Sequence, residues 1–167
     1  MDTTAFLPWL KLLHVGGAFL FAAGHGVSMA VALRLRTERD PARMAALLDL
    51  SGSSLAAAFG GLLALFVAGI ASGIIAGYFG QGWIWAALVL LVVTAGLMTP
   101  LATGHFTQLR RALGQRTREM KPGDPDPVPL PAAEVAALAA GRWPELTTLI
   151  GAGGFMAILW LMVFKPF

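Results

Sequence analysis

The chain has 167 residues, of which 57% are hydrophobic and only 13% are charged, whereas soluble domains carry about 25% charged residues. The absence of cysteine excludes disulfides, thiolate metal sites and cysteine nucleophiles. The formal net charge of +3 comes from arginines that flank apolar stretches, so we attribute it to membrane topology and expect no nucleic-acid partner. The twenty glycines are also typical of membrane helices. The composition therefore predicts an integral membrane protein.

Four apolar stretches are long enough to cross a bilayer, which takes roughly 20 helical residues. They cover residues 8–33, 55–79, 83–103 and 146–164. None contains an acidic residue. We expect an all-α fold in which these spans form one transmembrane four-helix bundle over residues 1–167. The connecting loops would then be residues 34–54 and 104–145, and membrane lipid would be the immediate partner of the spans.

Basic residues predict the orientation of this bundle. Ten of the twelve lysines and arginines fall within residues 34–43 and 110–142, and the other two are Lys11 and Lys165. Because cytoplasmic loops are enriched in lysine and arginine, both basic loops are predicted in the cytoplasm. Both termini would then lie on the outer, periplasmic side of a bacterial inner membrane.

The first span contains two histidines, His14 and His25. Eleven residues return to nearly the same helix face and advance roughly 16 Å along the axis. That face also carries small residues, among them Gly17, and one aromatic residue, Phe21. Polar side chains are costly in hydrocarbon and are usually retained for a function, which indicates metal or haem ligation. The alternative is that the imidazoles bond a backbone carbonyl or a hydroxyl.

Small residues at four-residue intervals predict the faces on which the first two spans pack closely. In the second span these are Gly69, Gly73 and Gly77, and in the first they are Ala18, Ala22 and Gly26. Such a glycine face is either a packing surface or room for a flat ligand. Before the second span, Asp40 and Pro41 resemble a helix N-cap and first position, which predicts a short interfacial helix over residues 41–50.

The third span ends near Pro100, which should bend or end the helix. His105 follows it, and Met98 precedes it at a depth closer to that of His25. We therefore consider His105 and Met98 as ligands opposite His25, with an interfacial His105 as the alternative. Beyond lie five prolines between residues 122 and 131, a predicted helix over residues 132–140, and the last span. Two tryptophans at span ends, Trp83 and Trp143, are predicted as interfacial anchors.

The opening motif, Trp9-x-Lys11-x-x-His14, resembles that of small bacterial multi-helix membrane proteins. These are the HemJ-type protoporphyrinogen oxidases, the copper-resistance protein D domain and related four-helix proteins. The resemblance covers the first span and implies a haem- or metal-binding role for His14. Residues 83–104 lack the basic residue that the HemJ family has within a later span, which argues against protoporphyrinogen oxidation.

The sequence therefore favours a membrane protein that binds haem b in redox or electron-transfer chemistry. The candidate cofactor residues are His14, His25, His105, Met98, Gly17 and Phe21. Copper is the alternative cofactor, with His14 and His25 as the metal ligands, since imidazole and thioether both suit copper. Two other functions stay open: a non-catalytic subunit that packs against partner helices or a second copy, and a small permeation protein for metal or solute. No enzymatic reaction is assigned.

Overall fold

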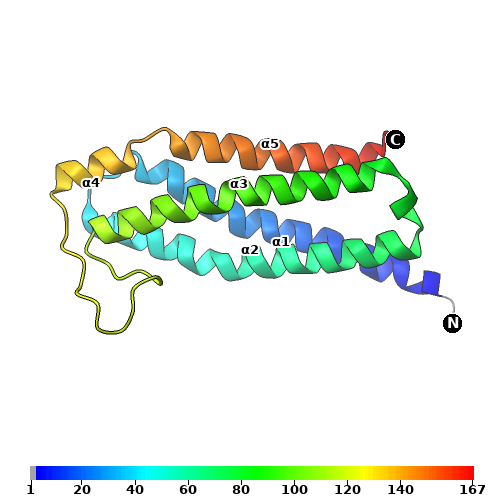
Figure 1. Cartoon of the computed structure of the whole chain (residues 1–167), viewed down its shortest axis with the longest axis horizontal. Helices are drawn as coiled ribbons and strands as arrows, with labels where there is room; N and C mark the ends of the chain where they lie inside the picture. Colours follow the sequence, from blue (N-terminus) through cyan, green and yellow to red (C-terminus); the bar gives the residue numbers. More distant parts are fainter. Residues whose placement is uncertain (1–2) are drawn as a thin grey trace.

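A computed structural model describes residues 3–167, which are α-helical and contain no β-strand in that range. A short 3-10 turn, η1 (Thr3–Phe6), leads into the first long helix (Figure 1). The helices that follow are α1 (Leu7–Leu35), α2 (Pro41–Ile75), α3 (Gly82–Ala112), α4 (Ala132–Ala139) and α5 (Trp143–Phe164), with a second 3-10 turn, η2 (Tyr78–Gly80), before α3.

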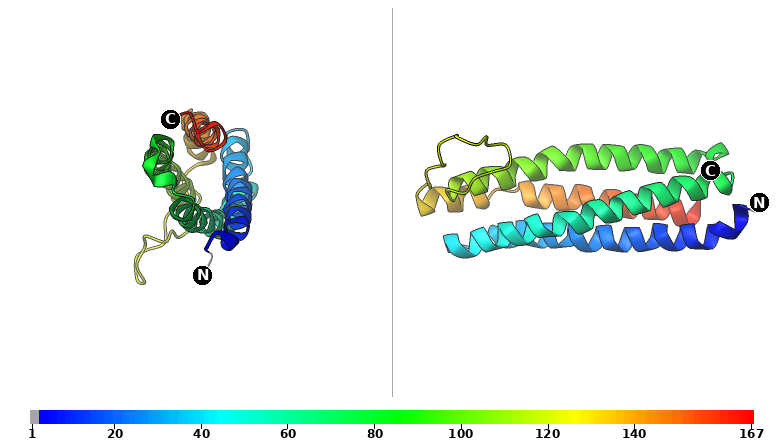
Figure 2. Two further views of the ribbon diagram at one scale, coloured as in Figure 1. Left: turned by 90° about the vertical axis from the view of Figure 1, so that its right-hand side faces the viewer. Right: turned by 90° about the horizontal axis from the view of Figure 1, so that it is seen from below.

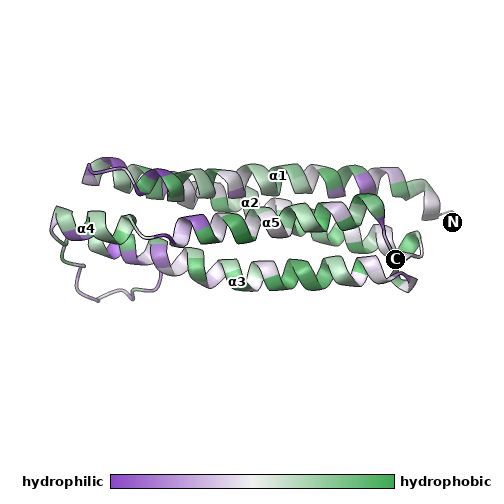
Figure 3. Ribbon diagram, turned by 90° about the horizontal axis from the view of Figure 1, so that it is seen from above, coloured by the Kyte–Doolittle hydropathy of each residue, from purple (hydrophilic) through white to green (hydrophobic). Residues whose placement is uncertain are grey.

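Four helical stretches of the described chain are long and apolar enough to cross a membrane. They are Thr4–Leu35, Pro41–Ile75, Gly82–Ala112 and Ala132–Phe164. Large apolar side chains cover the outside of the bundle, as at Phe19, Leu63 and Val92. Hydrophobic residues dominate the middle of the long helices (Figure 3). The predicted fold class, an all-α four-helix membrane bundle, is confirmed.

The four long helices form a ring in the order α1, α2, α3, α5 (Figure 2). Two pairs, α1–α2 and α3–α5, pack along much of their length, whereas α1–α5 and α2–α3 meet over short stretches. Helices α1 and α3 are therefore diagonal. The start of α1 and the end of α5 lie at one end of the bundle (Figure 1). The opposite end, formed by residues 34–43 and 110–142, is called the basic end below.

The α1–α2 interface is a glycine seam formed by Gly17, Gly24 and Gly61. A Cβ on Gly17 would lie 2.6 Å from the backbone nitrogen of Leu65, and one on Gly24 would lie 2.6 Å from that of Ala58. A Cβ on Gly61 would lie 2.8 Å from the carbonyl oxygen of Gly17. The two backbones thus touch directly, as small residues permit in membranes.

The predicted packing ladders are wrong in part, because close contact falls on other residues. Gly26 has open space beside it, and Gly77 lies beyond α2 with φ +71°. Gly69 and Gly73 do lie in contacts, but against side chains. The reason is that the seam follows a seven-residue interval from Gly17 to Gly24, not the four-residue interval of the ladder.

Helix α2 runs without interruption from Pro41, so residues 41–54 are part of a long helix and not a separate interfacial one. Asp40 caps it as predicted, its side chain accepting a hydrogen bond from Ala42 N at 3.0 Å. The serines near Gly52 do not break the helix, because Ser53 and Ser54 donate to carbonyls three residues earlier within it. Only residues 36–40 connect α1 to α2.

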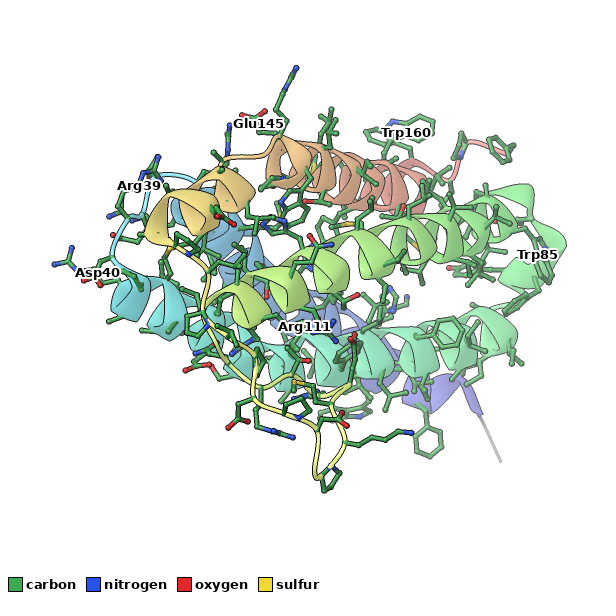
Figure 4. The ribbon with its side chains drawn as sticks, turned by 60° about the vertical axis from the view of Figure 1, so that its left-hand side comes forward. Arg39, Asp40, Trp85, Arg111, Glu145 and Trp160 are labelled. Atoms are coloured by element: carbon green, nitrogen blue, oxygen red, sulfur yellow. The ribbon has the colours of Figure 1, made fainter. Side chains whose placement is uncertain are left out.

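Ion pairs and hydrogen bonds join the helices at the basic end. Arg110 of α3 donates to Leu48 O at 2.6 Å and to Asp49 Oδ1 at 2.8 Å, both on α2. Arg36 at the end of α1 pairs with Glu145 in the first turn of α5. Figure 4 shows Glu145 at that turn and Asp40 at the α1–α2 connection. These links hold together helices that pack little along the rest of their length.

Helix α3 continues through Pro100 to Ala112, past the predicted end of the span. At the other end of α3, Trp83, which was predicted as an interfacial anchor, is buried in a cluster with Leu161 and is not exposed on the bundle surface. Its backbone nitrogen donates to Phe167 O at 3.1 Å. Lys165 lies 4.3 Å from the centre of the Tyr78 ring. The residues after α5 thus close the bundle over the start of α3.

Candidate functional site

His14 has a hydrogen-bond partner within the bundle. Its Nδ1 lies 2.7 Å from Leu65 O on α2, and since a carbonyl only accepts, Nδ1 carries the proton. The ring lies over Gly69, where a Cβ would come within 2.8 Å of Nδ1. A hydrogen bond to a backbone carbonyl is the alternative to metal or haem ligation that the sequence left open for His14. The bond uses Nδ1 and leaves the Nε2 lone pair free.

His25 contacts a different helix. A Cβ on Gly151 of α5 would stand 3.3 Å from His25 Nε2. It would also stand 2.6 Å from Sδ and 2.9 Å from Cε of Met98 on α3. The imidazole nitrogen and the thioether sulfur therefore meet over one glycine, the lack of a side chain at residue 151 giving both of them room. Met98 is buried, with 8% of its surface exposed.

The surroundings of His25 are aromatic and apolar. Phe21 stacks on its ring, with centroids 5.4 Å apart and planes 15° from parallel. Phe155 of α5 lies 6.5 Å from Phe21 between ring centroids. Among residues 3–167, neither nitrogen of His25 has a hydrogen-bond partner. The imidazole is therefore surrounded by aromatic and thioether side chains.

The His25–Met98 pair comes from diagonal helices. His25 stands on α1 and Met98 on α3, and the α3–α5 contact positions Met98. One turn from Met98, Thr94 packs against Gly154 of α5. Two glycines of α5 therefore contact side chains from two successive turns of α3. The glycine seam holds α1 against α2. The packing of α3 against α5 then places the Met98 thioether near the His25 imidazole.

His105 is elsewhere. Its ring lies 4.1 Å from that of Trp143 between centroids, and Trp143 precedes Gly151 by eight residues, about 12 Å along α5. His105 is therefore at the basic end, away from the His25–Met98 pair. Its ring nitrogens also have no hydrogen-bond partner in the described part of the chain.

The structure thus brings three of the predicted residues together, His25, Met98 and Phe21. Three others lie apart: His14 and Gly17 face α2, and His105 faces Trp143. His14 and His25 share a helix face but meet different helices, because α5 contacts α1 only over a short stretch.

Sequence reasoning missed Gly151 and Phe155. The available signal was the run of glycines at residues 151, 153 and 154 in the last span. Residues 3–167 contain no group of three or more His, Cys, Asp or Glu side chains placed to hold a metal. A metal at this site would depend on imidazole and thioether.

Comparison with known families agrees with the fold. Residues 8–166 match the family described as predicted integral membrane protein, DUF2269, and the chain belongs to this family. No curated protein and no solved structure matches the chain. The family supports a membrane protein, and it gives no support to the resemblance of the first span to copper-resistance protein D or HemJ.

Proposed function

We propose that this protein binds haem b in the inner membrane and transfers electrons, and that His25 Nε2 and Met98 Sδ would hold the iron. The observation that carries the proposal is the meeting of these two atoms over Gly151. Both are neutral donors suited to haem iron. In this proposal the basic end faces the cytoplasm and both termini lie outside, as the distribution of arginines favours.

The helix arrangement supports a haem between the two ligands. The two residues that would hold the iron come from α1 and α3, which are diagonal in the ring of helices (Figure 2). The two helix pairs pack little against each other, so separating them to admit a porphyrin breaks few contacts. When bound, the haem supplies a reversible one-electron couple whose potential histidine–methionine ligation raises.

The remaining residues have positioning roles. Phe21 stacks on the imidazole and limits its rotation. Gly151 leaves room for both ligand side chains, and ligation requires the neutral form of the imidazole.

Copper is the second candidate cofactor, and the same contact over Gly151 supports it. His25 Nε2 and Met98 Sδ both lie within 3.3 Å of one point, the Cβ position on Gly151. A single ion near the two atoms needs much less space than a porphyrin. A thioether selects monovalent copper, and imidazole also binds copper well. In this form the protein would be a copper-binding membrane protein.

The proposal is tested on purified protein in detergent, offered haem b or monovalent copper in turn. Haem binding by the wild type should give a Soret band and sharp bands on reduction, and copper binding should appear by elemental analysis. His25→Ala and Met98→Leu should abolish or strongly weaken the binding of either cofactor. The matched controls are His14→Ala, whose imidazole bonds Leu65, and Met156→Leu, on the exposed face of α5. A wild type that takes up neither cofactor would contradict the proposal and favour a non-catalytic subunit.

A further inference from the structure

An open groove of about 360 Å³ lies at the basic end, between the end of α3, the α3–α4 connection (residues 113–131) and α4. Two polar side chains of α3, Gln108 and Arg111, stand on its wall. The rest of the lining is apolar and consists of Ala112, Pro127, Val128, Leu130 and Leu138. Because Ala112 and Leu138 also pack in the hydrophobic core of the basic end, one side of the groove is continuous with that core.

Hydrogen bonds hold the α3–α4 connection in place. Leu130 N donates to Ala112 O at 2.9 Å, which ties the end of the connection back to α3. Within the connection, Arg116 donates to Asp126 Oδ1 at 2.6 Å and to Asp124 O at 2.9 Å. The groove wall formed by residues 127–130 is therefore positioned by the fold of the chain itself.

The length of α3 places this groove at the level of the lipid headgroups. Its 31 residues rise about 46 Å, and a bilayer with its headgroups is about 40–45 Å thick. A helix that starts at one membrane surface thus ends at the other. The connection projects sideways from the ring of helices (Figure 2), and its Val128 side chain is 82% exposed. A bilayer beside the bundle would cover this apolar side chain.

The polar edge of the groove is suited to a phosphate. Residues 110–121 contain five basic residues and one acidic residue, Glu119. Arg111 donates to Glu119 Oε2 at 2.8 Å, but both side chains are at least half exposed, and exposed ion pairs contribute little stability. Arg111 can therefore exchange this partner for another anion. Gln108 lies one turn earlier on α3 and adds an amide donor.

We propose that the groove binds one anionic phospholipid of the surrounding membrane, with an acyl chain on the apolar lining and the headgroup phosphate at Arg111 and Gln108. The apolar lining and the exposed Val128 favour a lipid over a soluble phosphate compound. The bound lipid would hold the α3–α4 connection against the membrane surface. This inference shares with the proposed function the position of the basic end at a membrane surface, and it requires no cofactor.

The experiment counts lipids bound to the purified full-length protein by native mass spectrometry, in a neutral detergent. Phosphatidylglycerol, which is anionic, is compared with phosphatidylcholine of the same acyl chains, which has no net charge. Wild type should bind one phosphatidylglycerol more tightly than phosphatidylcholine. Arg111→Gln should reduce this preference about fivefold, the effect of one basic residue near an anionic headgroup. Glu119→Gln removes the competing carboxylate and should increase the preference.

Arg43→Gln is the matched control, since it removes the same charge from an exposed arginine in the first turn of α2, outside the groove. It should leave the preference unchanged. Val128→Ser should weaken the binding of both lipids. Equal binding of the two lipids by wild type would overturn the inference, as would equal losses in Arg111→Gln and Arg43→Gln. Displacement of the lipid by glycerol phosphate would also overturn it, because a soluble phosphate would then suffice. None of these results depends on whether the protein takes up haem or copper.

Discussion

The glycine seam and the His25–Met98 pair both depend on glycines, but the glycines do different things. At the seam, the missing side chains of Gly17, Gly24 and Gly61 let one backbone touch another. At Gly151 the missing side chain leaves space that two movable side chains fill. The first arrangement is fixed by the backbone, whereas the second can adjust. Stability should therefore reside in the α1–α2 pair, and ligand binding in the junction between the pairs.

The largest expected effect is at the seam. Gly61→Leu places a side chain against the backbone of Gly17 and Phe21, which cannot move without separating the helices. We expect a loss of about 3 kcal/mol, the upper range for overpacking, measured as a lower unfolding temperature in detergent. Gly60→Leu is the control, because nothing lies within 4 Å of a Cβ there. Equal stability of the two variants would contradict a backbone seam.

Gly151→Ala tests the junction. The new methyl group meets the end of the Met98 side chain, which is flexible, so we expect a stability loss of only about 1 kcal/mol. Cofactor binding should fall much more, because His25 and Met98 are pushed apart. Gly153→Ala, in open space on the same helix, should change neither property. A stability loss as large as that of Gly61→Leu would mean that the junction is as rigid as the seam.

The two histidines separate the roles further. His14→Ala removes an interhelical hydrogen bond to Leu65 O, and we expect it to lower stability by about 1 kcal/mol, as for such bonds in membranes. His25→Ala removes an imidazole that has no hydrogen bond in the described chain, so it should leave apoprotein stability unchanged or higher. Urea unfolding of both apoproteins measures the difference. If the His25→Ala apoprotein were less stable than the His14→Ala apoprotein, the structural role assigned to His14 would be wrong.

The smallest effect concerns the connection between the two helices of the seam. Glu38 accepts hydrogen bonds from the backbone nitrogens of Arg39 and Asp40 and pairs with Arg34, and these contacts lower its pKa below the ordinary 4.5. The contribution of Glu38 to stability is thus complete above pH 4.5 and is lost as the pH falls through the lowered pKa. Glu38→Gln should flatten the stability profile in this acidic range, measured by unfolding temperature against pH. An unchanged profile would show that Glu38 does not titrate with folding.

Much of the fold could be predicted because each span is a continuous apolar run. Asp40 and Pro41 marked the start of α2 correctly. Pro100 did not end α3, since a membrane helix tolerates proline where neighbours satisfy the freed backbone groups. Trp83 was predicted at an interface but is buried, because nothing in its local sequence indicates that Phe167 lies over the start of α3.

The candidate site could be predicted only in part. Helical periodicity placed His14 and His25 on one face, and both His105 and Met98 were considered opposite His25, with Met98 closer in depth. Periodicity cannot say which helix each residue meets, and that depends on α5 approaching α1 only over a short stretch. Gly151 was missed for the same reason, because its contacts come from residues more than 50 positions away in sequence.

The short connection of residues 36–40 has a consequence for the order in which the protein is made. The seam joins two helices that are adjacent in sequence, so α1 and α2 can pair as a hairpin while later segments are still on the ribosome. The bond from Trp83 N to Phe167 O, by contrast, can form only after Phe167 has been synthesised. The junction that holds His25 and Met98 needs Gly151 of α5 and is therefore assembled after this hairpin.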